Sequence, residues 1–198
     1  SLAVTDHIQE VFNRQVEEPK HEEKLKKQLR ILEEITDSVS SEVRAQYEER
    51  PYPRWVNLRL PLKPISISEV VDQIKLKLPN RKITEAENPD ILIAGCGTGQ
   101  HSIGTASSFK GSKVLAIDLS LSSLAFAKRK MQELKHNNIE FLQGDILSLN
   151  KLNKKFDVIE CVGVLHHLKD PEYGLRILLD NLEPNGYLKL GLYSEYAR

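Results

Sequence analysis

Three glycines alternate with other residues directly after a short apolar run, in the stretch ILIAGCGTGQH at residues 91–101. Glycine loses more backbone entropy on folding than any other residue, so three of them in one turn require a physical reason. Either the turn is only tight, or a ligand approaches the backbone of Gly95, Gly97 and Gly99 closely. The spacing is GxGxG, whereas the dinucleotide fingerprint GxGxxG would need a glycine at Gln100 or Ser102. A nicotinamide dinucleotide is therefore disfavoured.

Two acidic residues follow at the ends of the next two apolar runs. In LAIDLS, Asp118 lies 118 − 99 = 19 residues after Gly99, where a carboxylate can accept hydrogen bonds from both hydroxyls of a ribose. The alternative is that Asp118 caps the helix that follows. In QGDIL, Asp145 could accept a hydrogen bond from an exocyclic amine. Two acidic strand ends beside a glycine turn indicate a nucleoside ligand.

The elements that must position these residues alternate along residues 90–198. Short apolar runs such as KVLAID alternate with helix-like segments such as SLSSLAFAKRKMQELK. This order predicts an α/β, doubly wound, mostly parallel sheet with helices on both faces. In such a sheet a ligand binds at the carboxyl ends of the strands, where the strand order reverses.

Residues 1–50 are predicted to form a helical extension, and residues 51–89 a proline-rich and aromatic segment, a helix and a linker. In residues 20–39 the side chains of one face recur in steps of three and four, which predicts one amphipathic helix that packs on this domain or on a missing one. They are Leu25, Leu29, Leu32, Ile35 or Thr36, and Val39. Tyr47, Tyr52 and Trp55 surround two prolines, and they form either an aromatic plug at the core edge or a flap over the site. Ser66 or Ser68 is expected to cap a helix that ends at Pro79.

The motifs ILIAGCGTG, AIDLS, QGDI and VIECVGVLHHLKDP, in this order over about residues 90–193, resemble those of class I S-adenosylmethionine-dependent methyltransferases. The resemblance implies a Rossmann-like sheet of strand order 3-2-1-4-5 and S-adenosylmethionine as cofactor. It implies that the glycine turn contacts the methionyl part, Asp118 the ribose and Asp145 the adenine amino group. The implied cofactor-binding residues are Gly95, Cys96, Gly97, Thr98, Gly99, Asp118, Leu119, Gly144, Asp145, Ile146 and Val162. Many members carry an acid where this chain has Ile93.

His166 and His167 follow the fourth strand, where the methyl acceptor would approach, and they are the candidate catalytic residues. The alternative is a helix start with one packed and one exposed histidine. The leading function is methyl transfer to a small-molecule or side-chain acceptor. The first alternative is a catalytically idle cofactor-binding or protein-interaction module of a larger protein. An NAD(P)-dependent oxidoreductase is less favoured. An Asn-Pro-Pro-Tyr-type turn is absent after this strand, which argues against base or glutamine methylation.

The composition gives no global attraction to nucleic acid, because 28 basic residues balance 28 acidic ones. No apolar run has the length of about 18 residues that a membrane helix needs. Cys96 and Cys161 form no CxxC motif, so we expect buried thiols, no metal, and a cytoplasmic protein.

A second, weaker resemblance rests on QYEERPYPRW, residues 46–55, and is to bacterial proteins that join a tetratricopeptide array to a methyltransferase. The fifth strand is predicted at residues 186–194. Its apolar edge suggests a C-terminally truncated fragment, or cover by the front-end helices or by a second copy in a homodimer.

Overall fold

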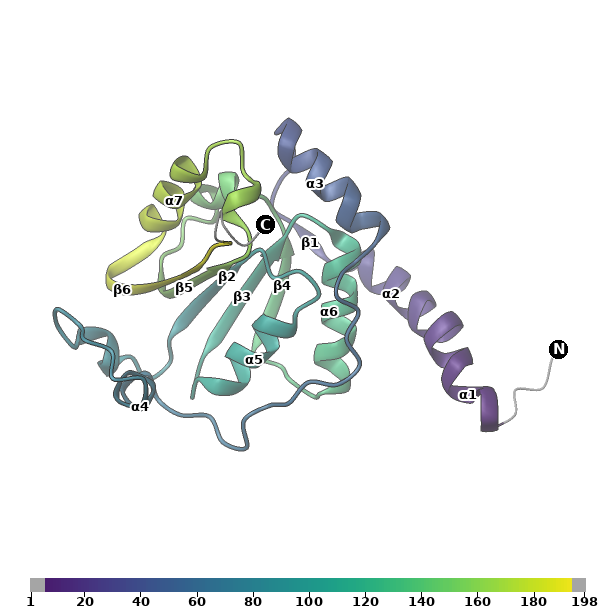
Figure 1. The fold of residues 1–198 in the computed structure, drawn as a ribbon, viewed down its shortest axis with the longest axis horizontal. Coiled ribbons are helices and arrows are strands. Elements are labelled where there is room, and N and C mark those ends of the chain that lie inside the picture. Colours follow the sequence, from purple (N-terminus) through teal and green to yellow (C-terminus); the bar gives the residue numbers. More distant parts are fainter. Residues whose placement is uncertain (1–5, 194–198) are drawn as a thin grey trace.

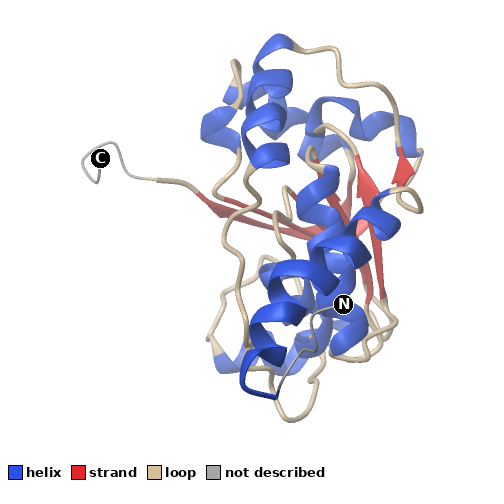
Figure 2. Ribbon diagram, turned by 90° about the vertical axis from the view of Figure 1, so that its right-hand side faces the viewer, coloured by secondary structure: helices blue, strands red, loops and turns tan. Residues whose placement is uncertain are grey.

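Parallel strands form one sheet that lies between two layers of helices (Figures 1 and 2). The computed structural model describes residues 6–193. Its sheet has six strands in the order β1-β4-β3-β2-β5-β6, and every pairing is parallel. The strands are β1 (Arg30–Ile31), β2 (Asp90–Ala94), β3 (Lys113–Asp118), β4 (Ile139–Gln143), β5 (Phe156–Val162) and β6 (Leu182–Gly191).

The predicted order 3-2-1-4-5 is confirmed, counting from β2, with β1 added beside β4. The chain runs from β2 outward through β3 to β4 and then crosses to β5 on the other side of β2. The strand order therefore reverses at β2. The glycine turn follows β2, so the sheet places it where such folds bind ligands.

Alternate residues of the central strands enter two separate hydrophobic clusters, as a sheet covered on both faces requires. On one face Ile91 and Ile93 pack with α5 (Gln100–Ser108) and α6 (Leu121–Glu133). On the other face Leu92 and Ala94 pack with α7 (Pro171–Asp180) and the 3₁₀ turn η3 (Ile146–Leu152). The position of the turn after β2 is thus fixed from both sides.

The front end differs from the single helix predicted over residues 20–39. The chain is helical through α1 (Asp6–Phe12), a π-helical turn (Asn13–Glu17) and α2 (Glu18–Lys26), and β1 follows. The prediction was wrong after Lys26 because β1 pairs with β4, and Leu32 N–H donates to the Gln143 carbonyl at 2.8 Å. Long-range sheet pairing overrides the local periodicity here.

The helix α2 packs on α6, so the apolar stripe of the front end rests on this domain. Leu25 and Leu29 belong to the same core cluster as α6. Arg129 of α6, only 2% exposed, donates from Nε to Glu22 at 2.9 Å and also pairs with Glu18 and Glu133. Glu22 in turn accepts two hydrogen bonds from Arg54, at 2.8 and 3.0 Å. This ion network, centred on the buried Arg129 and Glu22, joins α2, α6 and the proline segment.

A second front-end helix, α3 (Ser38–Glu49), begins at Asp37, whose side chain accepts from the Ser40 N–H at 2.9 Å. In Figure 1 it lies near the carboxyl ends of the strands.

The helix α4 (Ile67–Gln73) is capped by Ser66, as predicted, with Glu69 completing a capping box. It ends at Gln73 rather than at Pro79, and the expected linker contains a 3₁₀ turn, η2 (Lys82–Glu85).

The strand β6 covers residues 182–191 rather than the predicted 186–194, and residue 194 lies outside the described residues. Within residues 6–193 it pairs only with β5. The front-end strand β1 lies at the opposite edge of the sheet, so the described front end adds no strand beside β6. Leu190 and Leu192 are 39% and 60% exposed beside this edge. No helix within residues 6–193 has both the length and the apolar character needed to cross a membrane.

Candidate functional site

The three glycines of the turn after β2 have the same backbone conformation but different surroundings. Gly95, Gly97 and Gly99 all have positive φ, at 79°, 52° and 81°. A Cβ on Gly95 would lie 2.4 Å from a methyl group of Val164, and one on Gly99 would lie 2.5 Å from the Cβ of Ala127. A Cβ on Gly97 would meet no protein atom within 4 Å. The outer glycines therefore permit close packing, and Gly97 faces open space.

That space is a cavity at the carboxyl ends of β2, β3, β4 and β5. Of the predicted cofactor-binding residues, the cavity is lined by Gly95, Gly97, Asp118, Leu119, Gly144, Asp145, Ile146 and Val162. The connection after β5 adds Gly163, Val164, His167 and Leu168, and the front end adds Ser40, Val43, Tyr47 and Tyr52. The topology thus brings four separate motifs to one place.

The carboxylate of Asp118 is held from two sides. Its Oδ2 accepts from the Gly97 N–H at 2.7 Å, and its Oδ1 accepts from the Ser120 N–H at 3.0 Å. Burial raises the pKa of the Asp118 carboxyl above its ordinary value, and these backbone donors oppose the rise. The cap of α6 is Ser120, so the alternative role of Asp118 as a helix cap is not what the structure shows.

Asp145 ends the turn after β4 and is 6% exposed. It caps η3, because its Oδ1 accepts from the Leu147 N–H at 2.9 Å. Its neighbours Gly144 and Ile146 also line the cavity. Asp118 and Asp145 are therefore fixed by local hydrogen bonds on neighbouring strands while they face the same cavity.

Three predicted residues lie behind the turn instead of on the cavity wall. Cys96 is buried in the core beneath α5 and α6, and burial raises its pKa well above the ordinary value. Thr98 is 2% exposed and donates from Oγ1 to the Pro53 carbonyl at 2.7 Å. Gly99 begins α5 against Ala127. Within the turn, these residues anchor the backbone from which Gly97 projects.

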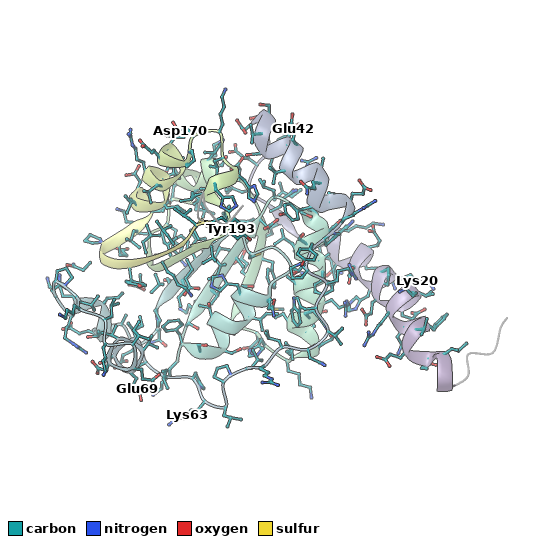
Figure 3. All side chains as sticks on the ribbon, in the orientation of Figure 1. Lys20, Glu42, Lys63, Glu69, Asp170 and Tyr193 are labelled. Carbon is teal, nitrogen blue, oxygen red and sulfur yellow. The ribbon has the colours of Figure 1, made fainter. Side chains whose placement is uncertain are left out.

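The two histidines occupy a short 3₁₀ turn, Leu165–His167. His167 is exposed and lines the cavity. The ring of His166 lies 4.2 Å from that of His167 and 4.7 Å from that of Tyr193, centroid to centroid. In Figure 3, Tyr193 lies in view between α3, which carries Glu42, and the connection that holds Asp170. His167 is thus the candidate that faces the cavity, and His166 packs behind it.

The aromatic residues of the proline segment do not all have the same role: one is a plug at the core edge, and others line the cavity. Trp55 donates from Nε1 to the Thr98 carbonyl at 3.0 Å, and its ring packs edge-on against Phe126 at 5.8 Å. It is a plug at the core edge. Tyr52 is 74% exposed and lines the cavity, and so does Tyr47.

Sequence reasoning missed the wall that α3 contributes. Ser40, Val43 and Tyr47 recur in steps of three and four, so they share one face of the helix, and that face lines the cavity. The periodicity was available in the sequence. The surface that this face of α3 contacts could not be predicted from the sequence, because it depends on how α3 packs on the rest of the domain.

Ile93 of β2 is buried, with 1% of its surface exposed. Its partner on the neighbouring strand β5 is Glu160. Glu160 accepts from Thr105 at 2.8 Å and pairs with His101 at 2.5 Å and Lys189 at 3.5 Å. Burial opposes ionisation of Glu160, but His101, Lys189 and Thr105 outweigh it and lower its pKa. This buried acid supports α5 rather than lining the cavity.

Comparisons with known proteins agree with this geometry. Residues 91–186 match the model of a family described as a methyltransferase domain. An uncharacterised protein of Synechococcus is 40% identical over 111 residues, which cover 56% of this chain and 27% of that protein. The ubiquinone biosynthesis O-methyltransferase of Coxiella burnetii is 29% identical over 134 residues, which cover 68% of this chain and 54% of that enzyme. The chain thus spans about half of the curated relatives' length or less.

Among solved structures, PKMT2 from Rickettsia typhi in complex with AdoHcy is 30% identical, with a TM-score of 0.50 over 59% of this chain and 22% of that one. Magnesium protoporphyrin IX methyltransferase from Synechocystis shares the fold, at 19% identity and a TM-score of 0.52 over 76% of this chain and 75% of that one. Together with the sheet order and the glycine turn, these matches support a class I S-adenosylmethionine-dependent methyltransferase domain, to which residues 91–186 are similar.

Proposed function

We propose that this chain binds S-adenosylmethionine in the cavity at the carboxyl ends of β2 to β5 and transfers its methyl group to a small-molecule or side-chain acceptor. The observation that carries the proposal is the open space at Gly97, flanked by Asp118 and Asp145 in one cavity. The AdoHcy complex of PKMT2, a structure 30% identical to this chain, supports the choice of ligand. When bound, this cofactor supplies a methyl group that is already activated by its sulfonium.

The residues fit the chemical groups of such a ligand. Each oxygen of Asp118 accepts one backbone N–H, and a carboxylate oxygen has a further lone pair for a ribose hydroxyl. Asp145 Oδ1 is held by Leu147, which leaves Oδ2 to accept from the adenine amino group. Leu119 and Ile146 also line the cavity and can provide apolar surface for the base. Gly97 leaves room for the methionyl part because it has no Cβ.

The charges and the apolar side chains of the cavity wall restrict which methyl acceptors can bind. Among the described residues, no lysine or arginine lines the cavity, and its formal charges are those of Asp118 and Asp145. An anionic acceptor would therefore find no lysine or arginine in the cavity wall to pair with. Tyr52, Val162 and Leu168 present mainly apolar surface. We propose a neutral or cationic acceptor, apolar where it meets the cavity.

His167 is the group in this wall that can take a proton. A methyl acceptor with a hydroxyl or amine nucleophile must lose a proton as its new bond to carbon forms, and a neutral imidazole nitrogen can accept that proton. The remaining contributions of the chain are positioning and exclusion of water, which serve a displacement whose leaving group is already activated.

Titration calorimetry with S-adenosylhomocysteine, S-adenosylmethionine and NAD tests the proposal. We expect saturable binding of the first two ligands and none of NAD. Binding of NAD alone would favour the oxidoreductase and overturn the proposal. Turnover with neutral phenol, amine and thiol acceptors then distinguishes a methyltransferase from an idle cofactor-binding module, because the module binds the cofactor without forming a methylated product.

A further inference from the structure

The helix α3, which forms part of the cavity wall, is joined to α6 through Glu48. Glu48, in the last turn of α3, reaches the start of α6. Its Oε2 accepts from the Ser122 N–H at 3.0 Å and from the Ser120 hydroxyl at 3.0 Å. Its Oε1 accepts from the Ser122 hydroxyl at 2.8 Å. A carboxylate in this place is stabilised by the free N–H groups and the dipole at the start of a helix.

Further contacts reinforce the same junction. The Ser120 hydroxyl also lies 3.1 Å from the Tyr47 carbonyl, and Lys26 of α2 lies 3.4 Å from Glu48 Oε1. Burial opposes ionisation of Glu48, but the hydrogen bonds from Ser122 and Ser120 and the charge of Lys26 outweigh it and lower its pKa. The carboxylate is therefore held in its charged form at the junction.

The junction is coupled to the proposed ribose site through Ser120. Ser120 contacts Glu48 through its hydroxyl and donates its backbone N–H to Asp118 Oδ1 at 3.0 Å. The negative charge of Glu48 also contributes to the rise in the pKa of Asp118. On the same helix, Tyr47 directly precedes Glu48 and Val43 lies five residues before it, and both line the cavity.

We propose that Glu48 is a positioning residue for cofactor binding: its carboxylate docks α3 on the start of α6 and so holds Ser40, Val43 and Tyr47 as the cavity wall beside Asp118. The inference rests on the proposed function, because the wall matters only if the cavity holds the cofactor. It also extends that function to the front end, which lies outside the residues matched by the family model.

The test compares Glu48→Ala with Glu49→Ala. Glu49 is the next residue of the same helix, and its exposed side chain pairs only with the adjacent Arg50 among the described residues. Calorimetry should show that Glu48→Ala weakens S-adenosylhomocysteine binding about tenfold, because the loss of the three hydrogen bonds to the Glu48 carboxylate frees the wall. Glu49→Ala should change the affinity less than twofold. Glu48→Gln keeps one acceptor oxygen and should fall between the two.

Two further measurements separate positioning from general stability. Hydrogen exchange in residues 38–49 should be faster in Glu48→Ala than in the wild-type protein, while the amides of β2 and β3 stay equally protected. In a double-mutant cycle with Asp118→Ala, the combined loss of affinity should be smaller than the product of the two single losses, since both residues act through Ser120.

Equal affinity of the Glu48→Ala and wild-type proteins would overturn the inference, and so would loss of protection throughout the sheet. If the wild-type protein does not bind S-adenosylhomocysteine, the proposed function fails, and this result is distinct from failure of the docking. The docking is then judged by hydrogen exchange alone, and unchanged exchange in residues 38–49 of Glu48→Ala would contradict it.

Discussion

Gly95, Gly97 and Gly99 share a left-handed backbone but have different surroundings. The first and last are enclosed by Val164 and Ala127, whereas the space beside Gly97 is open. The same residue type therefore serves packing at two positions and access at the third. Single substitutions should separate these roles. A side chain at an enclosed glycine should reduce stability, whereas one at Gly97 should reduce ligand affinity.

Gly97→Ala should retain the fold and lose cofactor affinity. An alanine at positive φ costs about 1–2 kcal/mol of stability, and its Cβ would meet no protein atom within 4 Å. The methyl group would instead occupy space proposed for the methionyl part. Calorimetry with S-adenosylhomocysteine should show at least a tenfold loss.

Gly99→Ala is the matched contrast, because its Cβ would lie 2.5 Å from that of Ala127. Thermal denaturation should show a larger loss of stability than Gly97→Ala shows. Undiminished affinity in Gly97→Ala would remove Gly97 from the site.

Asp118→Ala should weaken S-adenosylhomocysteine binding by roughly 1–3 kcal/mol, because ribose hydroxyls would be left without an acceptor. The substitution also removes the acceptor for the Gly97 N–H, so part of the loss reflects a looser turn. Asp72→Ala, at an exposed side chain of α4, is the control and should leave affinity unchanged. Equal binding by both variants would show that Asp118 does not hold the ligand.

At the scale of elements, the junction between β5 and α5 depends on a buried charge. Glu160, 4% exposed, connects β5 to Thr105 and His101 of α5 and to Lys189 of β6. The helix α5 starts at the glycine turn. The contacts of Glu160 with α5 therefore also help to hold the turn in place. Because these groups lower its pKa, ionised Glu160 stabilises the folded protein.

Glu160→Gln should therefore reduce stability at pH 7 and flatten its dependence on acid. A carboxyl whose pKa is lower in the folded than in the unfolded protein stabilises the fold above its ordinary pKa of 4.5. That contribution is lost as the pH falls below this value and through the folded pKa. Urea unfolding from pH 7 to pH 3 should show a smaller decline in the variant.

The control for this measurement is Glu140→Gln, at an exposed ion pair with Arg30. Exposed pairs contribute little, so its curve should follow that of the wild-type protein. Parallel curves for Glu160→Gln and the wild-type protein would contradict the assignment of this acid dependence to Glu160.

The elements differ in how far local sequence determines them. The central strands were predictable because each is a short apolar run bounded by turn residues, and their order follows from right-handed crossovers. The front end was not. Arg30 and Ile31 continue a helical periodicity, yet they pair with Leu142 and Gln143 of β4, more than a hundred residues away. Periodicity carries no information about such a partner.

At the scale of the whole molecule, the sheet order brings separate motifs into one site. Gly97, Asp118 and Asp145 were predictable because parallel strands end at the same edge. The wall made by Tyr47 was not, since it depends on how α3 packs against α6 rather than on a motif. The link to a tetratricopeptide array and pairing of the β6 edge with a second copy stay predictions.

A crystal structure of the protein with S-adenosylhomocysteine tests the central claim most directly. We expect the ribose hydroxyls on the Asp118 carboxylate, the adenine amino group beside Asp145, and the homocysteine chain over Gly97. His167 should lie at the open end, on the side of the sulfur. A nucleoside bound elsewhere, or a cavity without ligand at a saturating concentration, would contradict the account.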